Sequence, residues 1–159
     1  MDIQVASNFE RLLFDVMDGD CDALAARMEA FRDDGGLMLS RAERRKIAEN
    51  FTSHAVDEKQ TLAEIRSHYE QTKTLIDPHT AVARIGAKAM RKSGVMSGRI
   101  VTLSTAHPAK FPDAVKKATG IMPDLPEKHA DLFDRKETMV RGPNDVGAIK
   151  SMIAKKARR

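Results

Sequence analysis

Apolar residues recur at intervals of three and four along most of this 159-residue chain. This spacing gathers them on one face of a helix, whereas a half-buried strand would alternate apolar and polar residues. Capping residues such as Ser40, which is expected to form a capping box with Glu43, precede several of these runs, and glycines such as Gly35 and Gly120 follow them. The pattern predicts helices that start near residues 7, 20, 40, 57, 80, 108, 125 and 143.

Two segments read as strands instead of helices. Residues 99–104 are rich in β-branched side chains, and residues 74–76 form a short apolar run. Residues 51–56 fit either a short strand or an extended connector. Each of the first two segments is followed by small polar residues and then by a helix, which predicts a parallel pair with a right-handed crossover.

Parallel strands would bring the residues that follow them to one sheet edge. Asp77 follows the first strand and Thr105 follows the second. Ligands of open α/β sheets collect at the carboxyl ends of the strands, so we expect these two residues to share a pocket.

So few strands cannot form a complete sheet, because each strand needs neighbours on both sides. Either the protein is mostly helical, or the rest of its sheet lies on chain that is absent. The extended start of the sequence, Ile3-Gln4-Val5, suggests that the chain begins in the middle of a larger unit.

Composition is that of an ordinary globular domain, with 42% hydrophobic and 31% charged residues. Lys and Arg exceed Asp and Glu by 27 to 23, and several of the basic residues lie in the last ten positions. The single cysteine, Cys21, excludes an intramolecular disulfide and favours a cytoplasmic location. No apolar run has the length of a membrane span, so we expect no membrane partner.

The sequence contains no complete catalytic or metal-binding pattern. Its histidines lack the pairing at i and i+4 and the nearby cysteines or carboxylates that metal sites use. No nucleophile elbow is present either. Taken alone, Thr105 would be a turn residue and Asp77 a helix cap.

A nine-residue motif changes this picture. Leu103-Ser104-Thr105-Ala106-His107-Pro108-Ala109-Lys110-Phe111 resembles the C-terminal signature of threonine synthases, which are pyridoxal-phosphate enzymes of the tryptophan-synthase-β fold type. Met1-Asp2-Ile3 with Ser7-Asn8-Phe9-Glu10-Arg11, Asp77-Pro78-His79-Thr80-Ala81-Val82 and the helical tail agree in order and spacing. The similarity spans essentially the whole chain.

The resemblance implies an α/β fold: the helix-rich C-terminal part of a large cofactor domain, with few parallel strands flanked by helices and a sheet that this chain leaves incomplete. We expect a helical region at 1–56, strand-helix units with the cofactor-side motifs at 57–120, and a helical extension at 121–159. The implied reaction converts O-phospho-L-homoserine and water to L-threonine and phosphate, with pyridoxal 5'-phosphate as cofactor.

The resemblance also assigns site residues. Thr105 is expected to face the cofactor's ring nitrogen, with Ser104 as the adjacent alternative. Asp77, which replaces a commoner glutamate, is expected near the ring's edge. The remaining expected pocket-lining residues are His79, Thr80, His107 and Lys110.

One half of the site is missing. In the family, the Schiff-base lysine and the glycine-rich phosphate loop lie upstream of the position that matches Met1. The sequence shows neither, so we expect no catalytic residue in this chain. We also expect the chain alone to bind cofactor poorly and to need the N-terminal portion of the enzyme as its partner.

Two other interpretations compete. The first is a mildly basic helical module that binds nucleic acid or a partner protein. One Tyr and no Trp oppose nucleic-acid binding, because base stacking uses aromatic side chains among basic ones. The second is a complete enzyme of another class, which the lack of any other catalytic pattern opposes.

Overall fold

The computed structural model describes residues 7–157 and contains helices and loops only. Met1–Asp124 and Leu125–Arg159 form two separate compact units. The expected extended segment at residues 3–5 lies outside the described residues. The expected regional divisions after residues 56 and 120 stay predictions.

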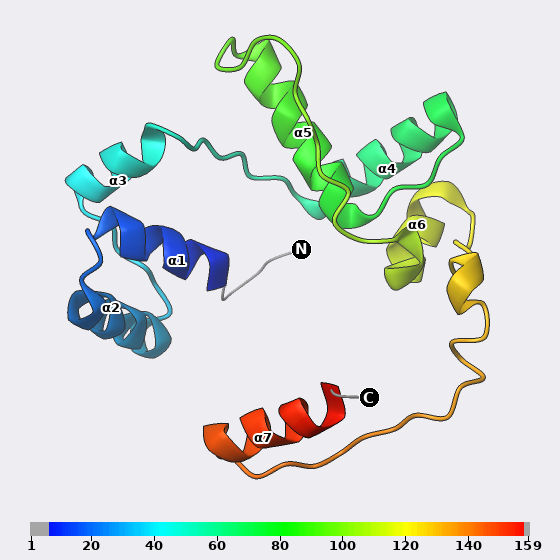
Figure 1. The fold of residues 1–159 in the computed structure, drawn as a ribbon. Helices are drawn as coiled ribbons and strands as arrows, with labels where there is room; N and C mark the ends of the chain where they lie inside the picture. The colour runs from blue at the N-terminus through cyan, green and yellow to red at the C-terminus, as the bar shows by residue number, and fades with distance from the viewer. Residues whose placement is uncertain (1–6, 158–159) are drawn as a thin grey trace. The chain divides into compact units, whose positions relative to one another are not determined.

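The first helices form a small group. α1 (Ser7–Val16) contacts both α2 (Cys21–Asp34) and α3 (Arg41–Ala48), as Figure 1 shows in blue and cyan. Leu13 and Val16 are its buried residues. The Lys46 ammonium on α3 donates to the Val16 carbonyl at 3.0 Å and to the Asp18 carboxylate at 2.9 Å. This basic side chain therefore satisfies an otherwise unpaired carbonyl at the end of α1.

α3 begins with the capping box that the sequence predicts. Ser40 accepts from the Glu43 backbone N–H at 3.2 Å, and Glu43 accepts from the Ser40 backbone N–H at 2.6 Å. The Glu43 carboxylate also binds the Arg27 guanidinium at 3.2 Å, which ties α3 to α2. The hydrogen bonds from Arg27 and from the Ser40 backbone lower the pKa of Glu43 from 4.5 to about 2.

This lowered pKa predicts a pH-dependent stability for the α1–α3 group. The folded state favours ionised Glu43, so its stabilisation is present above about pH 4.5 and is lost as the pH falls towards 2. We expect Glu43→Gln to cost about 1 kcal/mol near neutral pH and almost nothing at the acid end. Urea unfolding at several pH values measures this; equal destabilisation across the range would contradict it.

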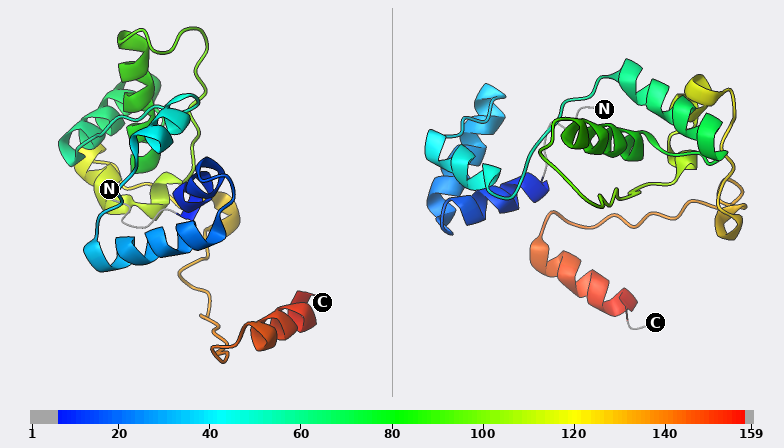
Figure 2. Two further views of the ribbon diagram at one scale, coloured as in Figure 1. Left: turned by 90° about the vertical axis from the view of Figure 1, so that its left-hand side faces the viewer. Right: turned by 90° about the horizontal axis from the view of Figure 1, so that it is seen from above.

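The second group of helices surrounds the main apolar core. α4 (Glu58–Thr72) packs against both α5 (Pro78–Lys92) and α6 (Pro112–Thr119), and the views in Figures 1 and 2 agree on this. Ile65 on α4 is fully buried, and it clusters with Ile76, Ala81 and Ala118. These residues come from all three helices and from the segment before α5. The cluster therefore holds the start of α5 in place.

A buried carboxylate joins α4 to α5. Glu64, only 8% exposed, accepts from Arg84 at 2.9 Å and from Lys88 at 2.6 Å. Burial alone would raise the pKa of Glu64, but the hydrogen bonds from Lys88 and Arg84 outweigh it and lower the pKa below its ordinary value. Glu64 is therefore kept ionised between two cations.

Two polar contacts join α4 to α6. The Arg66 side chain donates to the Ala118 carbonyl at 2.7 Å, and Lys117 lies 2.8 Å from Glu58. The first of these satisfies a carbonyl at the end of α6, next to the αL residue Gly120 that terminates the helix.

The expected parallel strands are wrong for this structure. Residues 74–76 and 99–104 are outside regular secondary structure, residues 51–56 form a connector, which was one of their two expected forms, and none of the described residues is in a strand. A strand is stabilised by hydrogen bonds to a neighbouring strand, and residues 7–157 offer these segments none. Val101 and Leu103 are 83% and 69% exposed, so the segment also lacks an apolar cover.

The second compact unit is small. The helix expected over residues 125–133 is a single 3₁₀ turn, η2 (Glu127–His129), without a side-chain cap at its start. The expected final helix forms as α7 (Val146–Ala157), a few residues later than predicted. No helix in the described part of the chain is long and apolar enough to cross a membrane.

Candidate functional site

Asp77 is the centre of the candidate site. It caps the N-terminus of α5, and Pro78 occupies the first helical turn, where its missing N–H costs nothing. The preceding Ile76 is part of the apolar core. This combination draws Asp77 inward, and its side chain is fully buried.

Neighbouring groups satisfy both oxygens of the buried carboxylate. Asp77 Oδ1 accepts from the His79 backbone N–H at 2.9 Å and lies 3.0 Å from His79 Nδ1. Asp77 Oδ2 accepts from the Thr80 hydroxyl. A buried carboxylate needs such partners, because an isolated buried charge is strongly unfavourable.

The network continues to the nine-residue motif. Ser104 Oγ lies 3.3 Å from Thr80 Oγ1. The single hydroxyl proton of Thr80 is directed at Asp77, so Ser104 donates to Thr80 in this pair. Two sequence motifs therefore meet through the side chains of Thr80 and Ser104, which are 24 positions apart in the chain.

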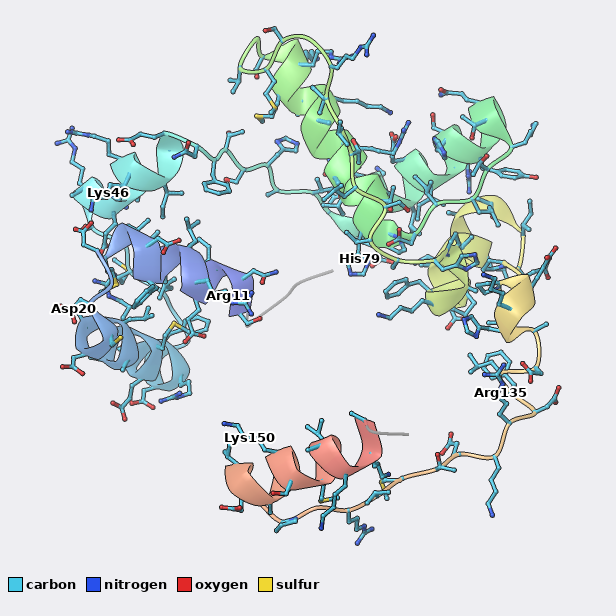
Figure 3. All side chains as sticks on the ribbon, viewed as in Figure 1. Arg11, Asp20, Lys46, His79, Arg135 and Lys150 are labelled. Carbon is cyan, nitrogen blue, oxygen red and sulfur yellow. The ribbon has the colours of Figure 1, made fainter. Side chains whose placement is uncertain are left out.

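His79 is held on its other side by an aromatic ring. Its imidazole lies 4.9 Å from the Phe111 ring, centroid to centroid, with the planes tilted by 53°. Figure 3 shows His79 at the N-terminal end of α5. The side chain is 28% exposed, so part of the ring remains accessible beside the buried carboxylate.

The rest of the motif forms a short helical turn. η1 (Pro108–Lys110) is capped by His107, whose Nδ1 accepts from the Ala109 backbone N–H at 3.2 Å. Lys110 is exposed, and its ammonium lies 5.7 Å from the centre of the Phe111 ring. α6 follows at Pro112, so the helix expected from Pro108 is split at Phe111.

The structure thus unites only some of the expected site residues. Asp77, His79, Thr80 and Ser104 form one hydrogen-bonded network. Thr105 is exposed, and no hydrogen bond joins it to this network within residues 7–157. The same holds for His107 and Lys110, which lie further along the motif.

Phe111 is part of the motif, but no sequence pattern indicates that its ring contacts His79. Its contact with His79 depends on how the loop folds back, and residue spacing does not reveal that.

No group of three metal-binding side chains occurs among the described residues. The site offers a buried carboxylate, an accessible imidazole and two adjacent exposed hydroxyls.

Comparisons with known proteins agree on one family. The family model for the C-terminal region of threonine synthase matches residues 80–153. Threonine synthase from Pseudomonas aeruginosa is 40% identical over 160 residues, covering 100% of this chain and 34% of that protein. Threonine synthase from Corynebacterium glutamicum is 34% identical, covering 96% of this chain and 32% of the relative.

Solved structures give the same result. Threonine synthase from Brucella melitensis, with pyridoxal phosphate bound, has a TM-score of 0.70 and 37% identity over 100% of this chain and 34% of its own. The yeast threonine synthase has a TM-score of 0.65 and 28% identity, over 99% of this chain and 35% of its own. The nucleic-acid or partner-binding interpretation finds no support in these matches.

The chain spans about a third of the length of these relatives. The matched region nevertheless includes both motifs of the Asp77 network, which meet through Thr80 and Ser104. The chain is therefore similar over its whole length to the C-terminal part of threonine synthases.

Proposed function

We propose that this chain supplies the C-terminal part of a threonine synthase, which converts O-phospho-L-homoserine and water to L-threonine and phosphate with pyridoxal 5'-phosphate as cofactor. The observation that carries the proposal is the network from Asp77 through Thr80 to Ser104. It brings together the two motifs by which the sequence resembles the family.

The side chains present fit one wall of a pyridoxal-phosphate site. Both oxygens of Asp77 are occupied by protein donors, which leaves that carboxylate unavailable to the cofactor's ring nitrogen. The Thr105 hydroxyl is exposed and can donate to an unprotonated ring nitrogen, whereas the Ser104 hydroxyl proton is directed at Thr80. When bound, the cofactor supplies the electron sink for the reaction.

We assign the ring-nitrogen contact to Thr105 and a supporting position to Ser104, whose hydroxyl already binds Thr80. Asp77 and Thr80 then support the wall, and His79 lines it. His107 and Lys110 follow on η1, where the exposed ammonium of Lys110 suits the rim or the phosphate side of the pocket.

The other wall would come from the N-terminal portion of the enzyme. Residues 99–103 favour a strand by sequence, yet expose Val101 and Leu103. We propose that a strand of the N-terminal portion pairs with this segment and completes a sheet. Within the assembled enzyme, residues 1–56, 57–120 and 121–159 would be the helical region, the cofactor-side region and the C-terminal extension, and its exposed free Cys21 suits the cytoplasm.

Reconstitution tests the proposal. The chain would be mixed with the N-terminal two thirds of the Pseudomonas aeruginosa threonine synthase, and phosphate release from O-phospho-L-homoserine would be measured. We expect release from the mixture and none from this chain alone. A mixture that forms a complex but stays inactive with cofactor and substrate would refute the proposed reaction.

A hydroxyl substitution tests the cofactor contact. We expect Thr105→Val to weaken pyridoxal-phosphate binding to the reconstituted enzyme about 5-fold, since one hydrogen bond contributes about 1 kcal/mol. Absorbance titration with cofactor measures the affinity. Thr105→Ser keeps the hydroxyl and serves as the control. If both variants lose affinity equally, or if neither loses affinity, Thr105 does not make the ring-nitrogen contact.

A further inference from the structure

Neither the motif resemblance nor the comparisons assign a chemical role to the imidazole of His79. We propose that His79 transfers protons in the site through its Nε2 atom, and that buried Asp77 is the positioning residue that fixes the imidazole ring through Nδ1. The substrate of this proton transfer rests on the proposed function. The orientation and tautomer of the His79 ring depend only on residues of this chain.

The hydrogen bond to Asp77 determines where the ring carries its proton. An ionised carboxylate can only accept, and Asp77 Oδ1 lies 3.0 Å from His79 Nδ1. Nδ1 is therefore the protonated nitrogen of the neutral ring. The lone pair then remains on Nε2, at the opposite edge of the imidazole.

Several contacts keep the ring in this orientation. The Asp77 oxygen that holds Nδ1 also accepts from the His79 backbone N–H at 2.9 Å. Thr80 occupies the other carboxylate oxygen, so the carboxylate cannot rotate without losing a partner. The Phe111 ring contacts the imidazole in a tilted arrangement, with the ring centroids 4.9 Å apart. The ring is thus held on two sides while 28% of the side chain stays exposed.

This arrangement suits a group that accepts a proton and returns it. When a water or substrate O–H bond breaks, its proton adds to Nε2 and the electron pair stays on oxygen. The imidazolium that forms carries its positive charge beside the Asp77 carboxylate, which stabilises it. Return of the same proton from Nε2 restores the neutral ring, so no other reactant is required.

A second histidine provides an internal comparison. His107 Nδ1 accepts from the Ala109 backbone N–H at 3.2 Å, so its proton lies on Nε2. The two histidines of the site are therefore expected in opposite tautomers. Their difference follows from a carboxylate acceptor in one case and an amide donor in the other.

Nitrogen NMR of the full chain tests the tautomers directly. At a pH where the imidazoles are neutral, ¹⁵N shifts should show Nδ1 protonated in His79 and Nε2 protonated in His107. An Nε2-protonated His79 in the unmodified chain would overturn the proposal, whether or not the enzyme can be reconstituted.

A pair of cap variants tests the role of Asp77. Asp77→Ser keeps a good helix cap but removes the carboxylate, and we expect His79 to lose its preference for the Nδ1-protonated form. Asp57→Ser makes the same change at the cap of α4, where the carboxylate accepts from the Gln60 backbone N–H, and should leave the tautomer unchanged. Identical His79 spectra in both variants would overturn the positioning role, and the His107 signals report whether the site is still folded.

Kinetics of the reconstituted enzyme test the proton transfer. We expect His79→Gln to lower kcat about 100-fold with little change in KM, as for loss of a general acid–base group. Full activity of this variant would overturn proton transfer by His79 while leaving the proposed reaction intact. Failure of reconstitution itself would count against the proposed reaction and not against the tautomer assignment.

Discussion

Replacing Val101 by proline is expected to weaken the association on which the proposed activity with the N-terminal portion of a threonine synthase depends. Proline lacks the N–H that a central strand donates to its neighbour, so the neighbour's carbonyl is left unsatisfied at a cost of about 1–3 kcal/mol. Association should therefore weaken by about 10- to 100-fold. The rate of phosphate release, followed as the N-terminal portion is titrated in, measures this.

The isolated chain should tolerate the same substitution. Val101 is 83% exposed and belongs to no helix, so its replacement removes no core contact. Thermal unfolding followed by circular dichroism should be nearly unchanged. Val101→Thr, which keeps the N–H and the β-branch, is the matched control and should assemble normally. If Val101→Pro assembles as well as Val101→Thr, residues 99–103 do not pair as a central strand.

Replacing Ile65 by alanine is expected to destabilise the α4–α6 group by about 2–5 kcal/mol. Ile65 is fully buried at the centre of the cluster with Ile76, Ala81 and Ala118. Truncation leaves a cavity where three helices meet, in addition to removing buried apolar surface. Urea unfolding of the full chain measures the loss; Ile153→Ala on α7, at a residue 61% exposed, is the control and should cost far less.

The same change should disturb the candidate site. Ile76 packs in the cluster and is followed directly by Asp77, so a loosened core frees the start of α5. We expect faster hydrogen exchange at the His79 and Thr80 backbone amides in Ile65→Ala than in Ile153→Ala. Unchanged exchange at both amides would show that the network around Asp77 is stable without the core.

The capping residues at the starts of helices were predictable from the sequence. The capping box at Ser40 and Glu43 forms as expected, because both partners lie within one turn. The helix over α5 begins at Pro78 with Asp77 as its cap, as the Asp-Pro pair indicates. Asp77 is linked to the nine-residue motif through Thr80 and Ser104, whereas the expected pocket shared by Asp77 and Thr105 stays a prediction.

Features that depend on distant partners were not predictable. Residues 99–104 have a strand-like composition, but a strand forms only when another strand supplies hydrogen bonds, and no described residue does so. The link to Asp77 runs through Ser104, whereas spacing along a strand favours Thr105. The contact between Phe111 and His79 depends on the path of the loop, which has no periodic pattern.

The ion cluster of Glu64, Arg84 and Lys88 limits how this sequence can change over evolutionary time. A neutral residue at position 64 would leave two cations side by side against a partly buried surface. Changing either cation alone would leave the buried carboxylate with a single partner. Because the three effects are not additive, functional descendants should change these positions together, and their substitutions should covary.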